Sequence, residues 1–306
     1  MGRSGKRSGC LRFGCLSVLV LIGVSLCGAL VLFGTAFFGS RTESVKRQEL
    51  RRDVDRPSLE EPSPLAASLD GAGLLILDFT VGDFMIQPGE AGEPVRVEAK
   101  FDTSSYTLEE SFDPGTDGGW VYRVTFRQTG LIKDGGLRVL FGASYPELRV
   151  FIPPDVPIAL RGRFGKGGAD LELGGLWLTD VDLRLEKGGL DVNIGRPLAE
   201  PLRSFRVHGK QGGMSTRMVG NASPTEVDIF WQQGGSEVDL RGQWLNDSDV
   251  SIRSRMGGNH VQLPRGVRIE GLPGRGPLLT PNDEEVPVPT LHMSISSLMG
   301  GQQLSN

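Results

Sequence analysis

Paired glycines that recur at a nearly constant interval constrain the fold of this chain more than any other feature. Six of the Gly-Gly pairs in the chain recur at steps of 21, 24, 22, 23 and 43 residues, the last being close to two periods: Gly167-Gly168, Gly188-Gly189, Gly212-Gly213, Gly234-Gly235, Gly257-Gly258 and Gly300-Gly301. Apolar or β-favouring residues stand three and five positions after the second glycine, as Leu171 and Leu173 do. A repeat of about 20–50 residues with strand-like alternation predicts a stacked β architecture.

The chain is therefore predicted to be all-β, with a β-solenoid (right-handed β-helix-like) domain of stacked coils of about 22 residues. Each glycine pair is expected at the same corner of its coil, where the backbone is tight and a side chain would clash with the next coil. We accordingly expect Gly189→Val to impair folding far more than Asp191→Ala. An outer, solvated row is expected two residues after each pair: Asp170, Asp191, Ser215, Glu237, His260 and Gln303.

The folded domain is predicted to span residues 69–306, with the repeat starting at about residue 160. Before the repeat, β-favouring runs between Gly- and Pro-rich turns predict strands at 74–81, 94–101, 120–126 and 145–154. Near the C-terminus, residues 293–301 closely resemble residues 250–258. The Pro-rich stretch 272–289 between them is incompatible with a central strand and is expected to loop out and cover an end of the stack.

An apolar N-terminal stretch predicts a membrane anchor. Residues 1–12 form a basic tail, and residues 13–40 contain no charged side chain. About 20 apolar residues suffice to cross a bilayer, so this stretch is predicted to be one transmembrane helix. A cleavable signal peptide is the competing interpretation, with Gly34-Thr35-Ala36 as its cleavage site.

The orientation of the anchor is not decided by charge, because four basic residues precede the span and five follow it between Arg41 and Arg52. We predict a signal anchor in the cell membrane with the large C-terminal domain outside the cytoplasm. Residues 41–68 form the linker: 43–54 is expected to extend the membrane helix as a charged stalk, and Pro57, Pro62 and Pro64 favour extended chain.

The remaining charge pattern excludes one class of partner. Beyond residue 40 the chain has 29 basic and 37 acidic side chains, and this acidic balance does not attract nucleic acid. The three cysteines, Cys10, Cys15 and Cys27, lie in or beside the apolar stretch, so disulfides are not expected to hold the folded domain together.

No motif for catalysis, cofactor binding or metal binding is recognisable in the sequence. Walker and Gly-x-Ser-x-Gly motifs are absent, the calcium-binding nonapeptide does not recur, and His208, His260 and His292 lack partners at ligand spacing. We therefore predict no enzyme, no cofactor and no metal. A polysaccharide lyase using Lys166, Lys187, Asp170 and Asp191 is a weaker alternative, as is a sugar-stacking platform of Trp120, Trp177, Trp231 and Trp244, residues that more often fill a core.

The strand at 145–154 with Pro153-Pro154, followed by the Gly-rich repeat at 161–173, resembles the bacterial toast-rack or adhesin-like domains. These are similar to the C-terminal domains of LiaF-type cell-envelope stress proteins, and the resemblance covers roughly residues 70–306. It implies an extracytoplasmic, membrane-tethered β-solenoid without known catalytic residues. The LiaF type has several membrane spans where this chain has one, so a role in stress signalling does not carry over directly.

Three functional hypotheses follow. The first is a non-catalytic, single-pass membrane-anchored interaction or scaffold protein outside the cytoplasm, active in envelope stress or adhesion, with a protein or envelope-polymer partner and possible self-association. The second is a cytoplasmic-side, polymerising scaffold of the bactofilin kind. The third is a glycan-active β-helix enzyme.

Overall fold

The computed structural model describes residues 48–50, 72–115, 118–129, 145–272 and 288–305, with 48–50 described by backbone pairing alone. The predicted tail at 1–12, the anchor at 13–40, most of the linker and residues 273–287 of the Pro-rich segment lie outside this part. Within it, no helix has the length and apolar character that a membrane span needs. All of the described residues belong to one compact unit.

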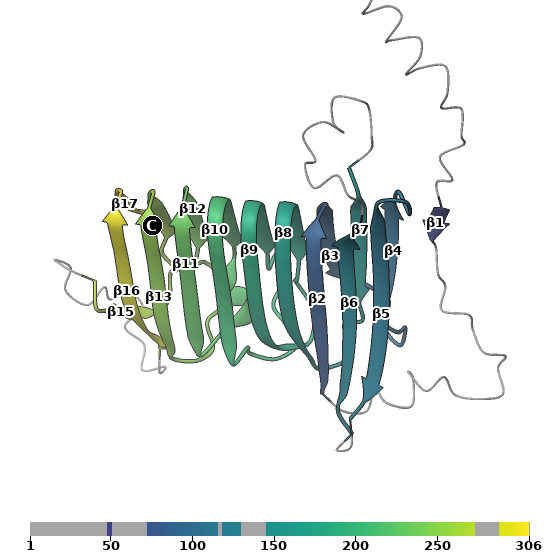
Figure 1. The fold of residues 1–306 in the computed structure, drawn as a ribbon. Coiled ribbons are helices and arrows are strands. Elements are labelled where there is room, and N and C mark those ends of the chain that lie inside the picture. Colours follow the sequence, from purple (N-terminus) through teal and green to yellow (C-terminus); the bar gives the residue numbers. More distant parts are fainter. Residues whose placement is uncertain (1–47, 51–71, 116–117, 130–144, 273–287, 306) are drawn as a thin grey trace, which may run out of the picture. The chain divides into compact units, whose positions relative to one another are not determined.

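The described chain is all-β (Figure 1). Its strands belong to one hydrogen-bonded sheet, and its one short helix is the 3-10 helix η1 (Val219–Ala222). The strands are β1 (Gln48–Leu50), β2 (Gly73–Val81), β3 (Asp83–Pro88), β4 (Arg96–Phe101), β5 (Tyr106–Pro114), β6 (Trp120–Gln128), β7 (Glu147–Ile152), β8 (Ile158–Glu172), β9 (Leu178–Asn193), β10 (Ser204–Arg217), β11 (Glu226–Gln233), β12 (Ser236–Asp239), β13 (Ser248–Met256), β14 (Asn259–Gln262), β15 (Arg268–Glu270), β16 (Thr290–Met299) and β17 (Gln302–Ser305). The runs predicted as strands fall on β2, β4, β6 and β7.

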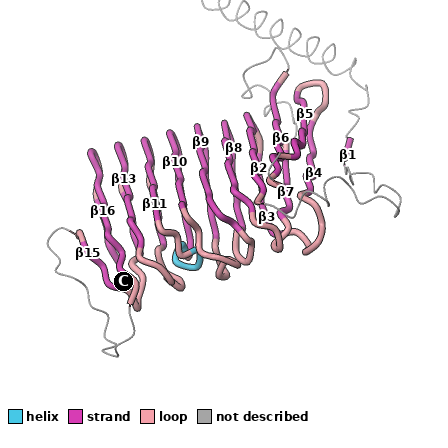
Figure 2. The backbone as a smooth tube through the Cα atoms, turned by 90° about the horizontal axis from the view of Figure 1, so that it is seen from below, coloured by secondary structure: helices cyan, strands magenta, loops and turns pink. Residues whose placement is uncertain are grey.

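Successive repeats lie side by side as parallel strands (Figure 2). In β8 and β9, Gly167 pairs with Gly188 and Gly168 with Gly189, and the next pair in β10 continues the same two rows. Beyond β10 the repeat is divided at its glycines: β11, β13 and β16 continue the first half of β10, and β12, β14 and β17 continue the second half.

The 43-residue step between the last two glycine pairs contains one repeat, and the expectation of nearly two periods was wrong. Strand β13 pairs directly with β16, with Val250 opposite Met293 and Met256 opposite Met299. Residues 250–258 and 293–301, which are similar in sequence, are thus also direct neighbours in space, paired strand to strand. The additional residues form an insertion that includes the short strand β15, which pairs with the start of β16.

The N-terminal end of the sheet is built differently. Strands β2 and β3 lie beside β8, and β6 and β7 follow them in parallel, but β4 and β5 run antiparallel to β7 and β6. Gln48–Leu50, which we expected within a helical stalk, instead form β1 and pair antiparallel with β4. A free strand edge offers backbone donors and acceptors that a charged segment can use as well as an apolar one, and this outweighs a local helical preference.

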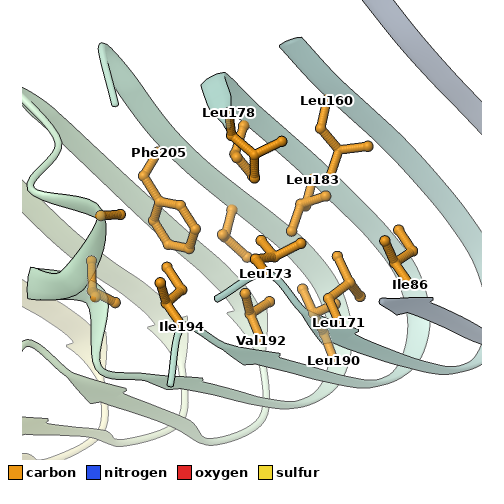
Figure 3. Close-up of a cluster of buried hydrophobic side chains, with 14 of the residues drawn as sticks. Ile86, Leu160, Leu171, Leu173, Leu178, Leu183, Leu190, Val192, Ile194 and Phe205 are labelled. Atoms are coloured by element: carbon orange, nitrogen blue, oxygen red, sulfur yellow. The ribbon is translucent and has the colours of Figure 1, made fainter. Parts of the chain in front are cut away.

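The core lies between the two halves of the repeat. Figure 3 shows side chains such as Leu183, Val192 and Phe205, all fully buried, gathered between the strands. Burying one such side chain contributes about 1.5–3 kcal/mol. Three of the four tryptophans, Trp120, Trp231 and Trp244, are also buried and Trp177 is half-buried, so these residues fill the interior rather than form a surface platform.

A buried carboxylate fixes the turn after β12. Asp239 has 6% side-chain exposure and accepts hydrogen bonds from the backbone N–H, Nε and Nη2 of Arg241 at 2.9, 2.8 and 2.8 Å. Burial alone would raise the pKa of Asp239, but the hydrogen bonds from Arg241 outweigh it and hold that pKa below its ordinary value. The carboxylate therefore stabilises the fold above the ordinary carboxyl pKa, and this contribution is lost as the pH falls through the lowered pKa.

We expect Asp239→Asn to lower the free energy of unfolding at pH 7 by about 1–3 kcal/mol, because a charge-assisted pairing is lost. The difference from the parent protein should be smaller at a second, acidic pH below the lowered pKa of Asp239, where the parent protonates as well. Urea unfolding at both pH values measures this. Asp249→Asn, at an exposed carboxylate without an ion pair among the described residues, is the control, and an equal pH dependence of the two variants would contradict the assignment.

Candidate functional site

A groove of about 1200 Å³ crosses the surface at the position of the second glycines. Its lining comes from the same positions of eight neighbouring strands, β7, β3, β8, β9, β10, β12, β14 and β17. We call it the glycine groove. Its floor is the row Gly168, Gly189, Gly213, Gly235, Gly258 and Gly301, continued by Asp83 in β3 and Glu147 in β7.

The first glycine of each pair is required by the backbone. Its φ lies between +119° and +157° in all six pairs, a region that L side chains rarely adopt. A Cβ added to Gly188 would lie 1.8 Å from the carbonyl oxygen of Gly167, and the other first glycines show the same contact at 1.7–1.8 Å. Gly82 occupies the equivalent position before β3, with φ +150°.

The second glycine is not required in this way. A Cβ added to Gly189 meets no heavy atom within 4 Å, and the same holds for Gly213, Gly235 and Gly301. The clash expected for a side chain at Gly189 is therefore wrong, because the tight approach involves Gly188 and its neighbours instead. A glycine that the backbone does not need leaves the floor of the groove bare in six successive repeats.

The predicted outer row forms a wall of this groove. Asp170, Asp191, Ser215, Glu237, His260 and Gln303 lie in register on neighbouring strands and all line it. Asp191 forms an ion pair with Arg217, and Nδ1 of His260 lies 3.8 Å from Glu237 Oε1. The other ring nitrogen of His260 contacts Ser305 Oγ at 3.1 Å.

The groove is acidic. Its lining includes one arginine, Arg149, against five carboxylates: Asp83, Glu147, Asp170, Asp191 and Glu237. Asp83 Oδ1 also accepts a hydrogen bond from the Gly168 N–H at 3.3 Å. Oδ1 of Asp191 is buried and accepts no hydrogen bond from the residues that the structure describes. A ligand with hydroxyl or amino donors would complement the exposed carboxylates of this lining.

The residues considered for a lyase are separated. Asp170 and Asp191 line the groove. Lys166 and Lys187 lie in register on β8 and β9, before the glycine pairs, and border a different hollow of about 350 Å³. Across the described ranges, no group of three or more His, Cys, Asp or Glu side chains is placed to hold a metal ion.

Sequence reasoning missed part of the groove. Asp83 and Glu147 continue the glycine row, but neither follows a glycine pair. The segment from Gly82 to Ile86 keeps the single required glycine and the alternation after it, with Phe84 and Ile86 buried. That pattern of one glycine followed by alternating apolar residues was the signal available.

No protein-family model matches the chain, and no curated protein matches it. Among solved structures, the chain is similar to the crystal structure of a "putative cell adhesion protein" from Clostridium sporogenes, with 15% identity and a TM-score of 0.39, over 76% of this chain and 92% of that one. A likeness at this level assigns neither a fold family nor a function, and the resemblance to toast-rack domains stays a prediction.

Proposed function

We propose that this chain is a non-catalytic, membrane-anchored interaction or scaffold protein that holds an extended partner in the glycine groove, outside the cytoplasm. The observation that carries the proposal is the continuity of the groove. A bare row of glycines and a row of polar side chains run together across six strands, and Asp83 and Glu147 continue the groove over two more.

The proposed architecture is a β-solenoid. It is supported by the parallel pairing of consecutive repeats, which places each glycine pair beside the previous one at a step of one repeat. In such a stack the outer rows extend as far as the repeats do, so a binding surface lengthens with repeat number.

The dimensions of the groove favour an extended chain as partner. Neighbouring strands lie about 4.8 Å apart, so eight strands span about 34 Å, the length of about ten residues of extended polypeptide. The missing side chains allow a chain to approach the backbone closely. Because the lining is acidic, we propose a polypeptide or envelope polymer that presents hydroxyl or amino groups.

The location of the domain rests on the sequence. The uncharged stretch 13–40 supports a single membrane span, and the resemblance to toast-rack domains supports an extracytoplasmic domain with a role in adhesion or envelope stress.

A second candidate, a polymerising scaffold of the bactofilin kind, is favoured by the C-terminal edge. Leu298 and Met299 at the end of β16 are 72% and 59% exposed, and β17 pairs only with β14 among the described strands. An open parallel edge with apolar side chains favours pairing with a second copy.

One cysteine variant tests both the groove and its location. In a background with Cys10, Cys15 and Cys27 replaced by serine, Gly189→Cys places the only thiol in the groove, where the added side chain meets open space. We expect a membrane-impermeant maleimide to label it in intact cells, and a benzophenone maleimide at this thiol to cross-link an extended polymer or peptide upon illumination.

The matched control is Ser294→Cys, an exposed position in β16 outside the groove, which should give no adduct. Adding Gly213→Val beside the probe should remove the adduct by filling the floor. Labelling only after permeabilisation would reject the extracytoplasmic location. Adducts containing only a second copy of the chain would favour the polymerising scaffold, and the absence of any adduct would count against the groove as the binding site.

A further inference from the structure

A second hollow, of about 710 Å³, lies on the sheet face formed by the first halves of the repeats. Strands β2, β6, β8, β9 and β10 contribute to its lining, which contains six arginines and three carboxylates. In an acidic protein, this is a local excess of positive charge. We call it the arginine patch: Arg123, Arg161, Arg163, Arg184, Arg203 and Arg206.

The three carboxylates of this hollow already have arginine partners. Asp180 pairs with Arg203 at 2.6 Å and Asp182 with Arg184 at 3.1 Å. Asp78 lies 3.8 Å from Arg127, which is outside the hollow. The lining therefore has no carboxylate left over to neutralise the other arginines.

A third arginine of the lining also forms an ion pair. Arg206 pairs with Glu226, a residue outside the hollow, at 2.7 Å. Arg123, Arg161 and Arg163 are exposed, and none of their side chains has an ion pair, hydrogen bond or ring contact with the residues that the structure describes.

The strand register brings these three side chains together. Ile76 of β2 lies opposite Arg123 of β6 on one side and Arg161 of β8 on the other, which puts the two arginine Cα atoms about 10 Å apart. Arg163 is two residues beyond Arg161 on the same face, about 7 Å away. Arginine side chains are long enough to converge on one group over such distances, and their planar forks bind oxyanions in a bidentate manner.

We propose that the arginine patch is an anion-binding site that takes the phosphate groups of a soluble ligand or polymer, through Arg123, Arg161 and Arg163. Unpaired guanidinium groups around a hollow match a multiply charged oxyanion. A lipid surface fits less well, because none of the exposed large apolar residues of the described chain, Tyr145, Leu245, Val288, Leu298 and Met299, lines this hollow. Peripheral membrane contacts combine basic groups with such apolar anchors.

The test is a calorimetric titration of tripolyphosphate into the full-length protein in neutral, phosphate-free detergent micelles. We expect saturable binding that weakens about tenfold in Arg161→Gln and about tenfold in Arg163→Gln, because each variant loses charge-assisted hydrogen bonds. Arg255→Gln is the matched control, since it removes the same charge from an exposed arginine outside the hollow and should leave the affinity unchanged.

Three results would overturn the proposal: no saturable binding of tripolyphosphate, an equal loss of affinity in all three variants, or binding that appears only when phosphatidylglycerol is added to the micelles. The last would assign the surface to a lipid headgroup. Thermal unfolding of each variant within a few degrees of the parent protein confirms that the exposed substitutions leave the fold intact.

Discussion

Gly188→Ala is expected to destabilise the domain by more than about 3 kcal/mol, which corresponds to a fall in Tm of about 10 °C. The alanine Cβ would lie 1.8 Å from the carbonyl oxygen of Gly167, and the backbone has φ +141° at this residue. A backbone oxygen held in the ladder between two strands cannot withdraw from such a contact without breaking that ladder. Both the strain and the clash therefore act against the folded state.

The adjacent position is the control for this variant. Gly189→Ala adds the same methyl group one residue later, where it meets no atom within 4 Å and the φ is not positive. We expect a change of less than about 1 kcal/mol, since surface substitutions away from special features have small effects. Urea and thermal unfolding followed by circular dichroism measure both variants, and equal losses would mean that the two glycines play the same structural part.

Trp231→Ala should be the most damaging truncation in the core, with an expected loss of about 3–5 kcal/mol. Trp231 is fully buried, and its indole N–H donates a hydrogen bond to the Gly212 carbonyl oxygen at 2.8 Å. Its neighbours in register are small, Gly209 on one side and Ser254 on the other. The large indole thus occupies the volume that these two positions leave free.

The dependence between Trp231 and Gly209 is testable by a double-mutant cycle. A Cβ at Gly209 would lie 2.0 Å from the Trp231 ring, so Gly209→Ala alone should cost about 1–3 kcal/mol by overpacking. In the Trp231→Leu background the same change should be nearly neutral, giving a coupling energy of about 1–3 kcal/mol. Additive effects of the two substitutions would show that the positions do not share this volume.

The glycine repeat is visible in the sequence, whereas the contact between Gly209 and Trp231 is not. The glycine period and the alternation after it indicated stacked β-strands, because a repeated strand buries its apolar face only against the next copy. The similarity between 250–258 and 293–301 indicated two copies of the repeat, although the step between them was wrongly taken as nearly two periods; their direct pairing is seen only in the structure. Nothing in the sequence around Gly209 indicated that it makes room for Trp231, since that contact joins residues 22 positions apart in different strands.

The candidate site divides in the same way. The sequence alone determined that the described chain is a β-rich repeat and which residues stand two places after each glycine pair, because alternation along a strand is a local property. Only the tertiary structure decided that the first glycine carries the backbone constraint while the second leaves a bare floor, and that Asp83 and Glu147 extend that floor. The tertiary structure also decided which arginines of the patch form ion pairs and that Arg123, Arg161 and Arg163 do not. Each of these depends on which atoms of neighbouring strands meet. That is set by the register between strands, which no single stretch of the sequence determines.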